Sequence, residues 1–204
     1  MKTKVKICGI TRIEDVKTLN KYLPDYVGFV FAPSRRRIEP EKVSELISEL
    51  DARIKKVGVF LNHSQRDVED IAYKCSLDVL QFHGDETVQY CASFKQKVWK
   101  AIGIKNAQSL KRIEDFQVEG ILLDSIVDGK SGGTGQPFDW KMVNCLPENV
   151  KVILAGGLNS RNVLEAIEKV KPFCVDISSG VETDGVKDTK KIKEFIELVK
   201  GVSI

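Results

Sequence analysis

Short runs of apolar, mostly β-branched residues recur along the chain and are separated by more polar segments. Most runs are continuously apolar and do not alternate with polar residues, a pattern typical of parallel strands buried on both faces. The pattern predicts eight strands, at residues 4–8, 26–31, 55–60, 78–82, 97–102, 120–124, 150–155 and 173–178.

The segments between these runs carry the apolar spacing of amphipathic helices. A capping box from Thr11 to Glu14 predicts the start of the first helix. Asn159 is the expected cap of a helix near the end of the chain, and Gly201 is expected just past the last helical turn. Weaker patterns predict helices at 40–50, 64–75, 86–94, 107–115 and 138–144.

Strand and helix alternate throughout, without a linker or a change in composition. This order predicts an α/β fold with one domain, residues 1–204, built as a (β/α)8 TIM barrel. An open doubly wound sheet is the alternative, because spacing alone does not show closure. In a barrel, the functional site lies at the carboxyl ends of the strands and in the loops that follow them.

Charge and composition narrow the function classes. The 32 basic and 29 acidic residues are interleaved, which argues against nucleic acid as the main partner. No apolar run approaches the ~20 residues that span a bilayer, and the N-terminus lacks the apolar core of a signal peptide. We therefore expect no membrane partner and a cytoplasmic location.

The five cysteines are widely spaced and form no CxxC pair, so neither a disulfide framework nor a metal site is expected. Each is a buried apolar residue by default. Cys8 differs because it ends the first predicted strand. From its position alone it is an inert core residue, a nucleophile or a general base.

Two loops at neighbouring strand ends contain glycines: "LAGGLNSRNV" after the seventh run and "DISSGVET" after the eighth. Backbone amides at such turns attract anions, and phosphate binding after strands seven and eight recurs among barrels. The alternative for Gly156 and Gly157 is a tight turn before the next helix. The location favours a phosphate site.

Other chemical groups fall at strand ends as well. Asp124 ends the sixth run and precedes a loop with four glycines, residues 129–140, which makes it a candidate acid beside a mobile flap. Among the three arginines at 35–37, one could grip a planar carboxylate. His83 is either catalytic or structural, and Gln81 shares its strand face.

The chain resembles the phosphoribosylanthranilate isomerases of tryptophan biosynthesis. Seven motifs in order carry the resemblance, from Lys6 to Glu182: "KICGIT", "GFVFAPSRRRI", "VGVFLN", "LQFHGDE", "LLDS" with "GGTGQPFDW", "LAGGLN" and "VDISSGVE". The resemblance implies a (β/α)8 barrel without cofactor or metal. It also implies an Amadori rearrangement of N-(5-phosphoribosyl)anthranilate to 1-(2-carboxyphenylamino)-1-deoxyribulose 5-phosphate.

The same resemblance implies roles for individual residues. Asp124 would be the general acid, Cys8 the general base, and Arg36 the ligand of the anthranilate carboxylate. Gln81, His83 and Asp176 would lie near the substrate. The phosphate would be bound by the amides around Gly156, Gly157, Ser179 and Gly180.

Three alternatives remain at this point. A sugar-phosphate epimerase would need metal-ligating side chains at several strand ends, and the chain has two histidines. An indole-glycerol-phosphate synthase commonly uses a strand-end lysine, whereas Lys100 lies inside the fifth run. A non-catalytic barrel that binds a phosphorylated ligand would need neither an acid nor a base. Whether the protein is a monomer or a homodimer is not predicted.

Overall fold

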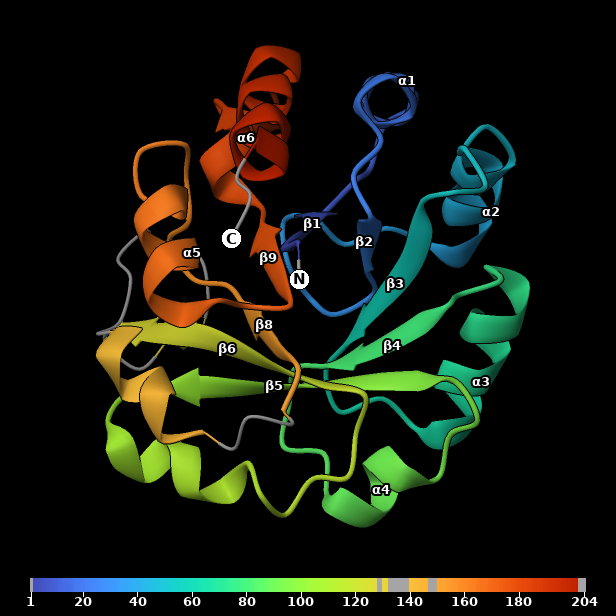
Figure 1. Ribbon diagram of the computed structural model, residues 1–204. Helices are drawn as coiled ribbons and strands as arrows, with labels where there is room; N and C mark the ends of the chain where they lie inside the picture. Colours follow the sequence, from blue (N-terminus) through green and yellow to red (C-terminus); the bar gives the residue numbers. More distant parts are fainter. Residues whose placement is uncertain (1, 128–129, 132–139, 147–149, 202–204) are drawn as a thin grey trace.

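Parallel strands form a closed barrel in the structure, a computed structural model that describes residues 2–127, 130–131, 140–146 and 150–201 (Figure 1). The barrel strands are β1 (Lys4–Cys8), β2 (Tyr26–Val30), β3 (Lys55–Phe60), β4 (Val79–Phe82), β5 (Lys97–Ile104), β6 (Gly120–Val127), β8 (Val152–Leu154) and β9 (Cys174–Ile177). These eight strands pair with one another in parallel.

Two pairings decide between a barrel and an open sheet. Strand β1 pairs with β9, which joins the first and last strands of the barrel. Strand β5 pairs with β6, so the ring has no free edge among these strands. The predicted (β/α)8 barrel is confirmed, and the open doubly wound sheet is wrong.

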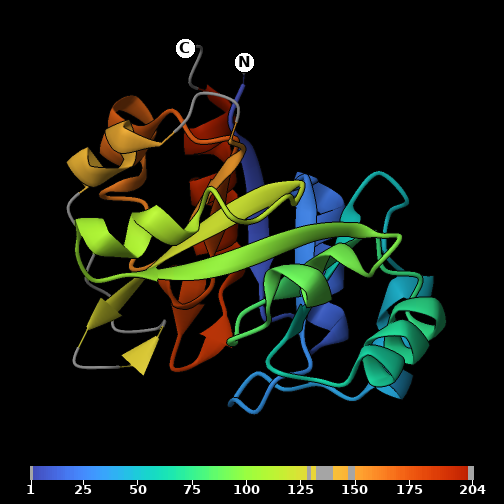
Figure 2. The ribbon, with the colours of Figure 1, turned by 90° about the horizontal axis from the view of Figure 1, so that it is seen from below.

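Helices surround the strands on the outside of the ring (Figures 1 and 2). The α-helices are α1 (Ile13–Tyr22), α2 (Pro40–Ser48), α3 (Gln65–Lys74), α4 (Val88–Ala92), α5 (Val163–Val170) and α6 (Thr189–Gly201). The connections after β5 and β6 contain the 3-10 segments η1 (Ala107–Arg112) and η2 (Trp140–Cys145) in place of predicted α-helices. Residues 138–139 of the second prediction lie outside the described residues.

Three predicted helix ends are wrong. Helix α1 begins after Arg12, which makes no side-chain cap, so the capping box at Thr11 does not form. Helix α5 begins after Asn162; Asn159 instead makes the preceding turn, and its carbonyl accepts the backbone N–H of Asn162 and Val163. Gly201 is the last residue of α6 and does not follow it.

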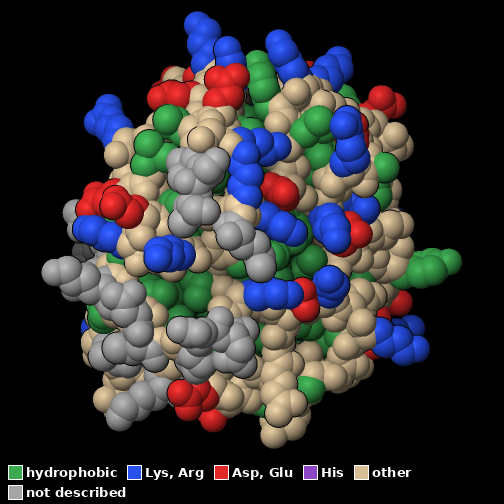
Figure 3. All heavy atoms as spheres, in the orientation of Figure 1, with side chains coloured by type: hydrophobic (Ala, Val, Ile, Leu, Met, Phe, Trp, Pro, Cys, Tyr) green, Lys and Arg blue, Asp and Glu red, His purple; other side chains and the backbone are tan. Residues whose placement is uncertain are grey.

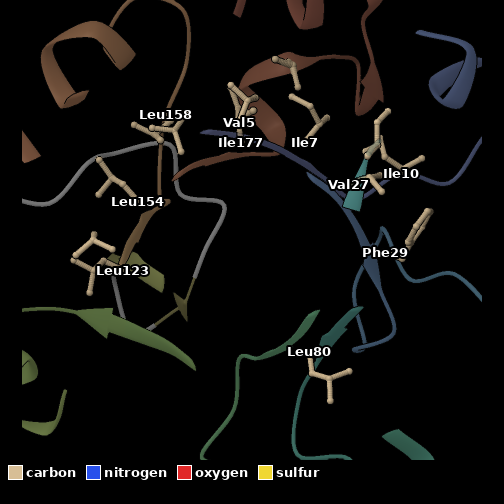
Figure 4. Close-up of a cluster of buried hydrophobic side chains, with 14 of the residues drawn as sticks. Val5, Ile7, Ile10, Val27, Phe29, Leu80, Leu123, Leu154, Leu158 and Ile177 are labelled. Atoms are coloured by element: carbon tan, nitrogen blue, oxygen red, sulfur yellow. The ribbon is translucent and has the colours of Figure 1, made fainter. Parts of the chain in front are cut away.

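The core has two parts, because alternate strand residues face opposite sides of the barrel wall. Val5, Ile7, Val27 and Phe29 are fully buried between strands and helices (Figure 4). A smaller cluster fills the barrel interior and contains Tyr26, Val57, Val79, Trp99, Ala101, Leu122, Ile153, Ala155 and Cys174. The interior is thus a packed core that supports the carboxyl end of the barrel.

Short strands extend the carboxyl end. Strand β6 continues past Asp124, where its last residues pair with the antiparallel β7 (Lys130–Ser131). After β9, the 3-10 segment η3 (Ser179–Val181) leads into a hairpin of β10 (Glu182–Thr183) and β11 (Val186–Lys187). Strands β7, β10 and β11 were not predicted, because each has only two residues.

Basic and acidic side chains are mixed on the face of the molecule shown in Figure 3. Within the described residues, no helix has the length and apolar character required to span a membrane.

Candidate active site

A cavity of about 490 Å³ opens at the carboxyl ends of the barrel strands. The cavity brings together residues that lie far apart in the sequence, from β1 to the loop after β9. Nine of the predicted site residues line it: Cys8, Arg36, Gln81, His83, Asp124, Gly156, Gly157, Asp176 and Ser179.

Gly180 is the predicted site residue that does not line this cavity. A Cβ atom on Gly180 would lie 2.1 Å from the carbonyl oxygen of Leu158. Gly180 therefore lets the loop after β9 pack against the loop after β8. Its contribution to the site is the close approach of the two glycine-containing loops.

Cys8 ends β1 and faces the cavity from the inner side of the barrel wall. Lys6 lies two residues earlier on the same strand face and is fully buried. Burial raises the pKa of the Cys8 thiol above its ordinary value, and the positive charge of Lys6 acts in the opposite direction. Of the surrounding charges, Lys6 thus favours the thiolate most strongly.

Lys6 also anchors a chain of polar contacts across the barrel. Its ammonium donates to Oδ2 of Asp176 at 2.7 Å and to Oε1 of Gln81 at 2.8 Å. Nε2 of Gln81 lies 3.2 Å from Nδ1 of His83. Nε2 of His83 lies 3.3 Å from Oδ2 of Asp124. The chain of contacts therefore runs from beneath the thiol to the carboxyl.

The chemistry of these groups determines which atom donates and which accepts at each contact. An ammonium can only donate, so the Gln81 atom beside it is the amide oxygen, and the amide nitrogen faces His83. That nitrogen also only donates, so Nδ1 of His83 is the acceptor and carries no proton. The ring proton of neutral His83 is then on Nε2, the nitrogen next to Asp124.

Asp124 is 5% exposed, and its Oδ1 atom has no hydrogen-bond partner among the described residues. Such an unpartnered buried oxygen is an exception in native structures. Gly156 makes room for it: the residue has φ +81°, and a Cβ atom there would lie 2.8 Å from Oδ1. Most of the predicted flap, residues 129 and 132–139, lies outside the described residues.

Arg36 reaches the cavity from the loop after β2. Its guanidinium forms a two-point ion pair with Glu182, from Nε to Oε1 at 2.7 Å and from Nη2 to Oε2 at 2.9 Å. Of the other two arginines, Arg35 also donates to Glu182, and Arg37 pairs with Glu39. Only Arg36 of the three lines the cavity with a side chain that is largely buried.

Sequence reasoning missed three charged residues of this region: Lys6, Glu182 and Lys187. Lys187 is buried, and its ammonium donates to the carbonyl of Ser178 and to Glu182. The spacing of Lys6 and Cys8 was a usable signal, because residues two apart share a strand face. Among the described residues, no group of three or more His, Cys, Asp and Glu side chains could hold a metal ion.

The site combines a thiol, a carboxyl and an arginine beside two glycine-containing loops. This combination is typical of barrel enzymes that move protons on a phosphorylated substrate. Comparison with known proteins identifies one family within this class. The family model described as "N-(5'phosphoribosyl)anthranilate (PRA) isomerase" matches residues 5–198, and the chain belongs to this family.

Curated relatives agree with the family match. An N-(5'-phosphoribosyl)anthranilate isomerase of Thermoanaerobacter pseudethanolicus is 52% identical over 200 residues, which cover 98% of each chain. The enzyme of Caldanaerobacter subterraneus subsp. tengcongensis is 48% identical over 200 residues, again 98% of each chain. The phosphoribosyl anthranilate isomerase structure from Thermotoga maritima has a TM-score of 0.89 at 38% identity, covering 98% of this chain and 100% of that one.

These findings confirm the predicted family and its class, an isomerase of tryptophan biosynthesis. They also decide against the epimerase, synthase and non-catalytic alternatives. Lys100, the lysine considered for a synthase, is buried and pairs with Glu86 at 2.9 Å.

Proposed function

We propose that the cavity binds N-(5'-phosphoribosyl)anthranilate and catalyses its Amadori rearrangement, with Asp124 as general acid and Cys8 as general base. The observation that carries this proposal is that one cavity of about 490 Å³ is lined by both groups, by Arg36 and by the two glycine-containing loops. A cavity of this size is suited to a substrate with an aromatic acid, a sugar and a phosphate.

Asp124 starts the reaction by giving a proton to the ring oxygen of the ribose. The bond from that oxygen to C1 breaks, and the nitrogen lone pair forms a protonated Schiff base with C1. The ring nitrogen Nε2 of His83 lies 3.3 Å from Oδ2 of the Asp124 carboxyl. His83 therefore positions the acid and need not contact the sugar.

Cys8 then removes the proton from C2. The positively charged imine next to C2 makes that proton more acidic, so a base of moderate strength is sufficient. The electrons of the C–H bond form an enol, which takes a proton at C1 and loses its hydroxyl proton to give the ketone. Burial raises the pKa of the Cys8 thiol overall, and the positive charge of Lys6 offsets part of that effect and so supports the base from below.

The two ends of the substrate are held by opposite walls of the cavity. Arg36 binds the anthranilate carboxylate, since a guanidinium matches a planar carboxylate through two hydrogen bonds. The phosphate lies against the loops of Gly156, Gly157, Ser179 and Gly180, where backbone amides can donate to it. A solved relative supports binding of a ligand of this kind: it was crystallised with reduced 1-(o-carboxyphenylamino)-1-deoxyribulose 5-phosphate, has a TM-score of 0.86 and is 38% identical. The cytoplasmic location stays a prediction.

Substitution of the acid and the base tests the assignment. We expect Cys8→Ser and Asp124→Asn each to lower turnover by at least ~100-fold, the usual lower range for loss of acid or base catalysis. Turnover is followed by the loss of phosphoribosylanthranilate fluorescence, and binding of the reduced product analogue shows that each variant is folded. Cys174→Ser is the matched control, because Cys174 is a buried barrel cysteine outside the cavity. Turnover near the wild-type value in either variant contradicts the role of that residue.

A further inference from the structure

Glu182 lies at the rim of the cavity and has no role in the reaction described above. Its side chain is 5% exposed and accepts four hydrogen bonds from three cations. Oε1 accepts from Arg36 at 2.7 Å and from Lys187 at 2.8 Å. Oε2 accepts from Arg36 and from Arg35, both at 2.9 Å. Both oxygens are therefore fully used within the protein.

The pair with Glu182 occupies one particular edge of the Arg36 guanidinium. Glu182 takes the edge made by Nε and Nη2. A guanidinium has five N–H donors in a rigid plane, so the edge made by Nη1 and Nη2 can still bind a second carboxylate. The orientation of Arg36 thus determines which donors a ligand in the cavity meets.

Glu182 is itself held in place by the hairpin that carries it. It lies directly opposite Lys187 in the β10–β11 pairing, and Lys187 also donates to the carbonyl and hydroxyl oxygens of Ser178. Lys191 donates to the backbone carbonyl of Glu182 at 2.7 Å. Because these contacts hold the Glu182 carboxylate in place, it can in turn hold the Arg36 guanidinium in one orientation.

Two further observations show that this arrangement is built for Arg36. A Cβ atom on Gly9, next to the proposed base, would lie 2.4 Å from Cδ of Arg36, so this glycine keeps the path of the arginine open. Burial alone would raise the pKa of Glu182, but the hydrogen bonds from Arg36 and Lys187 outweigh it and lower that pKa. Glu182 therefore stays charged. Three cations against one carboxylate leave the rim positive, as an acidic ligand requires.

We propose that Glu182 is a positioning residue that holds the Nη1–Nη2 edge of Arg36 toward the aromatic carboxylate of the substrate, and so sets the preference for that carboxylate. The inference rests on the proposed role of Arg36. It assigns selectivity for the acidic ring to the hairpin after β9, which contacts Arg36 from outside the cavity.

The test compares two inhibitors with the variant Glu182→Gln. The first is reduced 1-(o-carboxyphenylamino)-1-deoxyribulose 5-phosphate, and the second is the same molecule without the ring carboxylate. We expect the variant to bind the first inhibitor about 10- to 100-fold more weakly, the range for loss of a charge-assisted hydrogen-bond geometry. Binding of the second inhibitor should change by less than about twofold, and kcat should change less than KM.

Arg35→Met is the matched control, because Arg35 donates to the same carboxylate but is 61% exposed and does not line the cavity. It should affect the first inhibitor less than Glu182→Gln does. Equal weakening of both inhibitors by Glu182→Gln would mean that Glu182 only stabilises the fold, and tighter binding of the first would mean that it competes with the ligand. Either result overturns the proposal.

The variant Arg36→Met separates this inference from the proposed function. If Arg36→Met binds both inhibitors with the same preference as wild type, the carboxylate role of Arg36 is wrong. If Arg36→Met loses the preference while Glu182→Gln keeps it, the role of Arg36 stands and the role of Glu182 is wrong. In the double variant, we expect Glu182→Gln to have no further effect on the preference.

Discussion

The ion pair between Lys6 and Asp176 allows a quantitative test of the barrel interior. Replacement of Lys6 by Met keeps most of the side-chain volume and removes the ammonium. The pair is 2.7 Å long, and its side chains are 0% and 8% exposed, so water cannot replace the lost partner. Breaking a buried pair on one side costs about 3–5 kcal/mol.

A second effect adds to this cost. Oδ1 of Asp176 already lacks a hydrogen-bond partner among the described residues, so the variant would leave both carboxyl oxygens unpaired. The variant also leaves Oε1 of Gln81 without its donor, which costs about 1–3 kcal/mol. We therefore expect the free energy of unfolding to fall by at least about 3 kcal/mol, a large part of the ~5–15 kcal/mol typical of a native protein.

Urea unfolding followed by tryptophan fluorescence measures this change, since Trp99 is buried in the barrel interior. The double variant Lys6→Met/Asp176→Asn removes both charges and should recover much of the loss. A single variant within about 1 kcal/mol of wild type would refute the reasoning, because no uncompensated charge would then remain. A double variant as unstable as the single one would assign the loss to packing.

Two further expectations concern the cavity wall. The Cβ atom added in Gly156→Ala would lie 2.5 Å from the backbone nitrogen of Ser125, so atoms of the cavity wall must shift. We expect this displacement to lower kcat/KM at least ~10-fold. Gly185→Ala is the control: its backbone has a similar φ of +79°, but the nearest atom outside the adjoining residues would lie 3.8 Å from the added Cβ. This variant introduces backbone strain without a steric clash and should keep the wild-type kcat/KM. Alkylation of Cys8 by iodoacetamide should be slow at neutral pH and accelerate above pH 9.0, because burial raises the pKa of the thiol and the thiolate reacts. Rapid alkylation at pH 7 would contradict this environment.

The barrel could be predicted because its strands are buried on both sides and therefore remain apolar along their whole length. The start of α5 could not, because "LNSRN" offers two asparagines with similar capping preference. The choice depends on how the loop after β8 turns: the carbonyl of Asn159 accepts from Asn162 and Val163, which places the start of α5 at Val163.

The candidate site was predictable where single residues end strands, as with Cys8. Its supporting charges were not, because each partner is remote in the sequence: Asp176 lies 170 residues from Lys6, and Glu182 lies 146 residues from Arg36. Local patterns treat a lysine in a strand as exposed, whereas the closed ring buries Lys6 completely. The position of His83 beside Asp124 likewise depends on the pairing of both β4 and β6 with β5, which no local pattern contains.

Pairing between the first and last strands of the barrel gives the order of synthesis a chemical consequence. Strand β1 emerges from the ribosome well before its neighbour β9 and the counterion Asp176. Until then the growing chain carries an unpaired strand edge, and Lys6 is a lysine in water. Lys6, which supports the proposed base, and Arg36, the proposed carboxylate ligand, both precede residue 40, and both obtain their ion-pair partners from residues after 170. A nascent chain can therefore acquire this activity only after β9 has been made, when the ring closes.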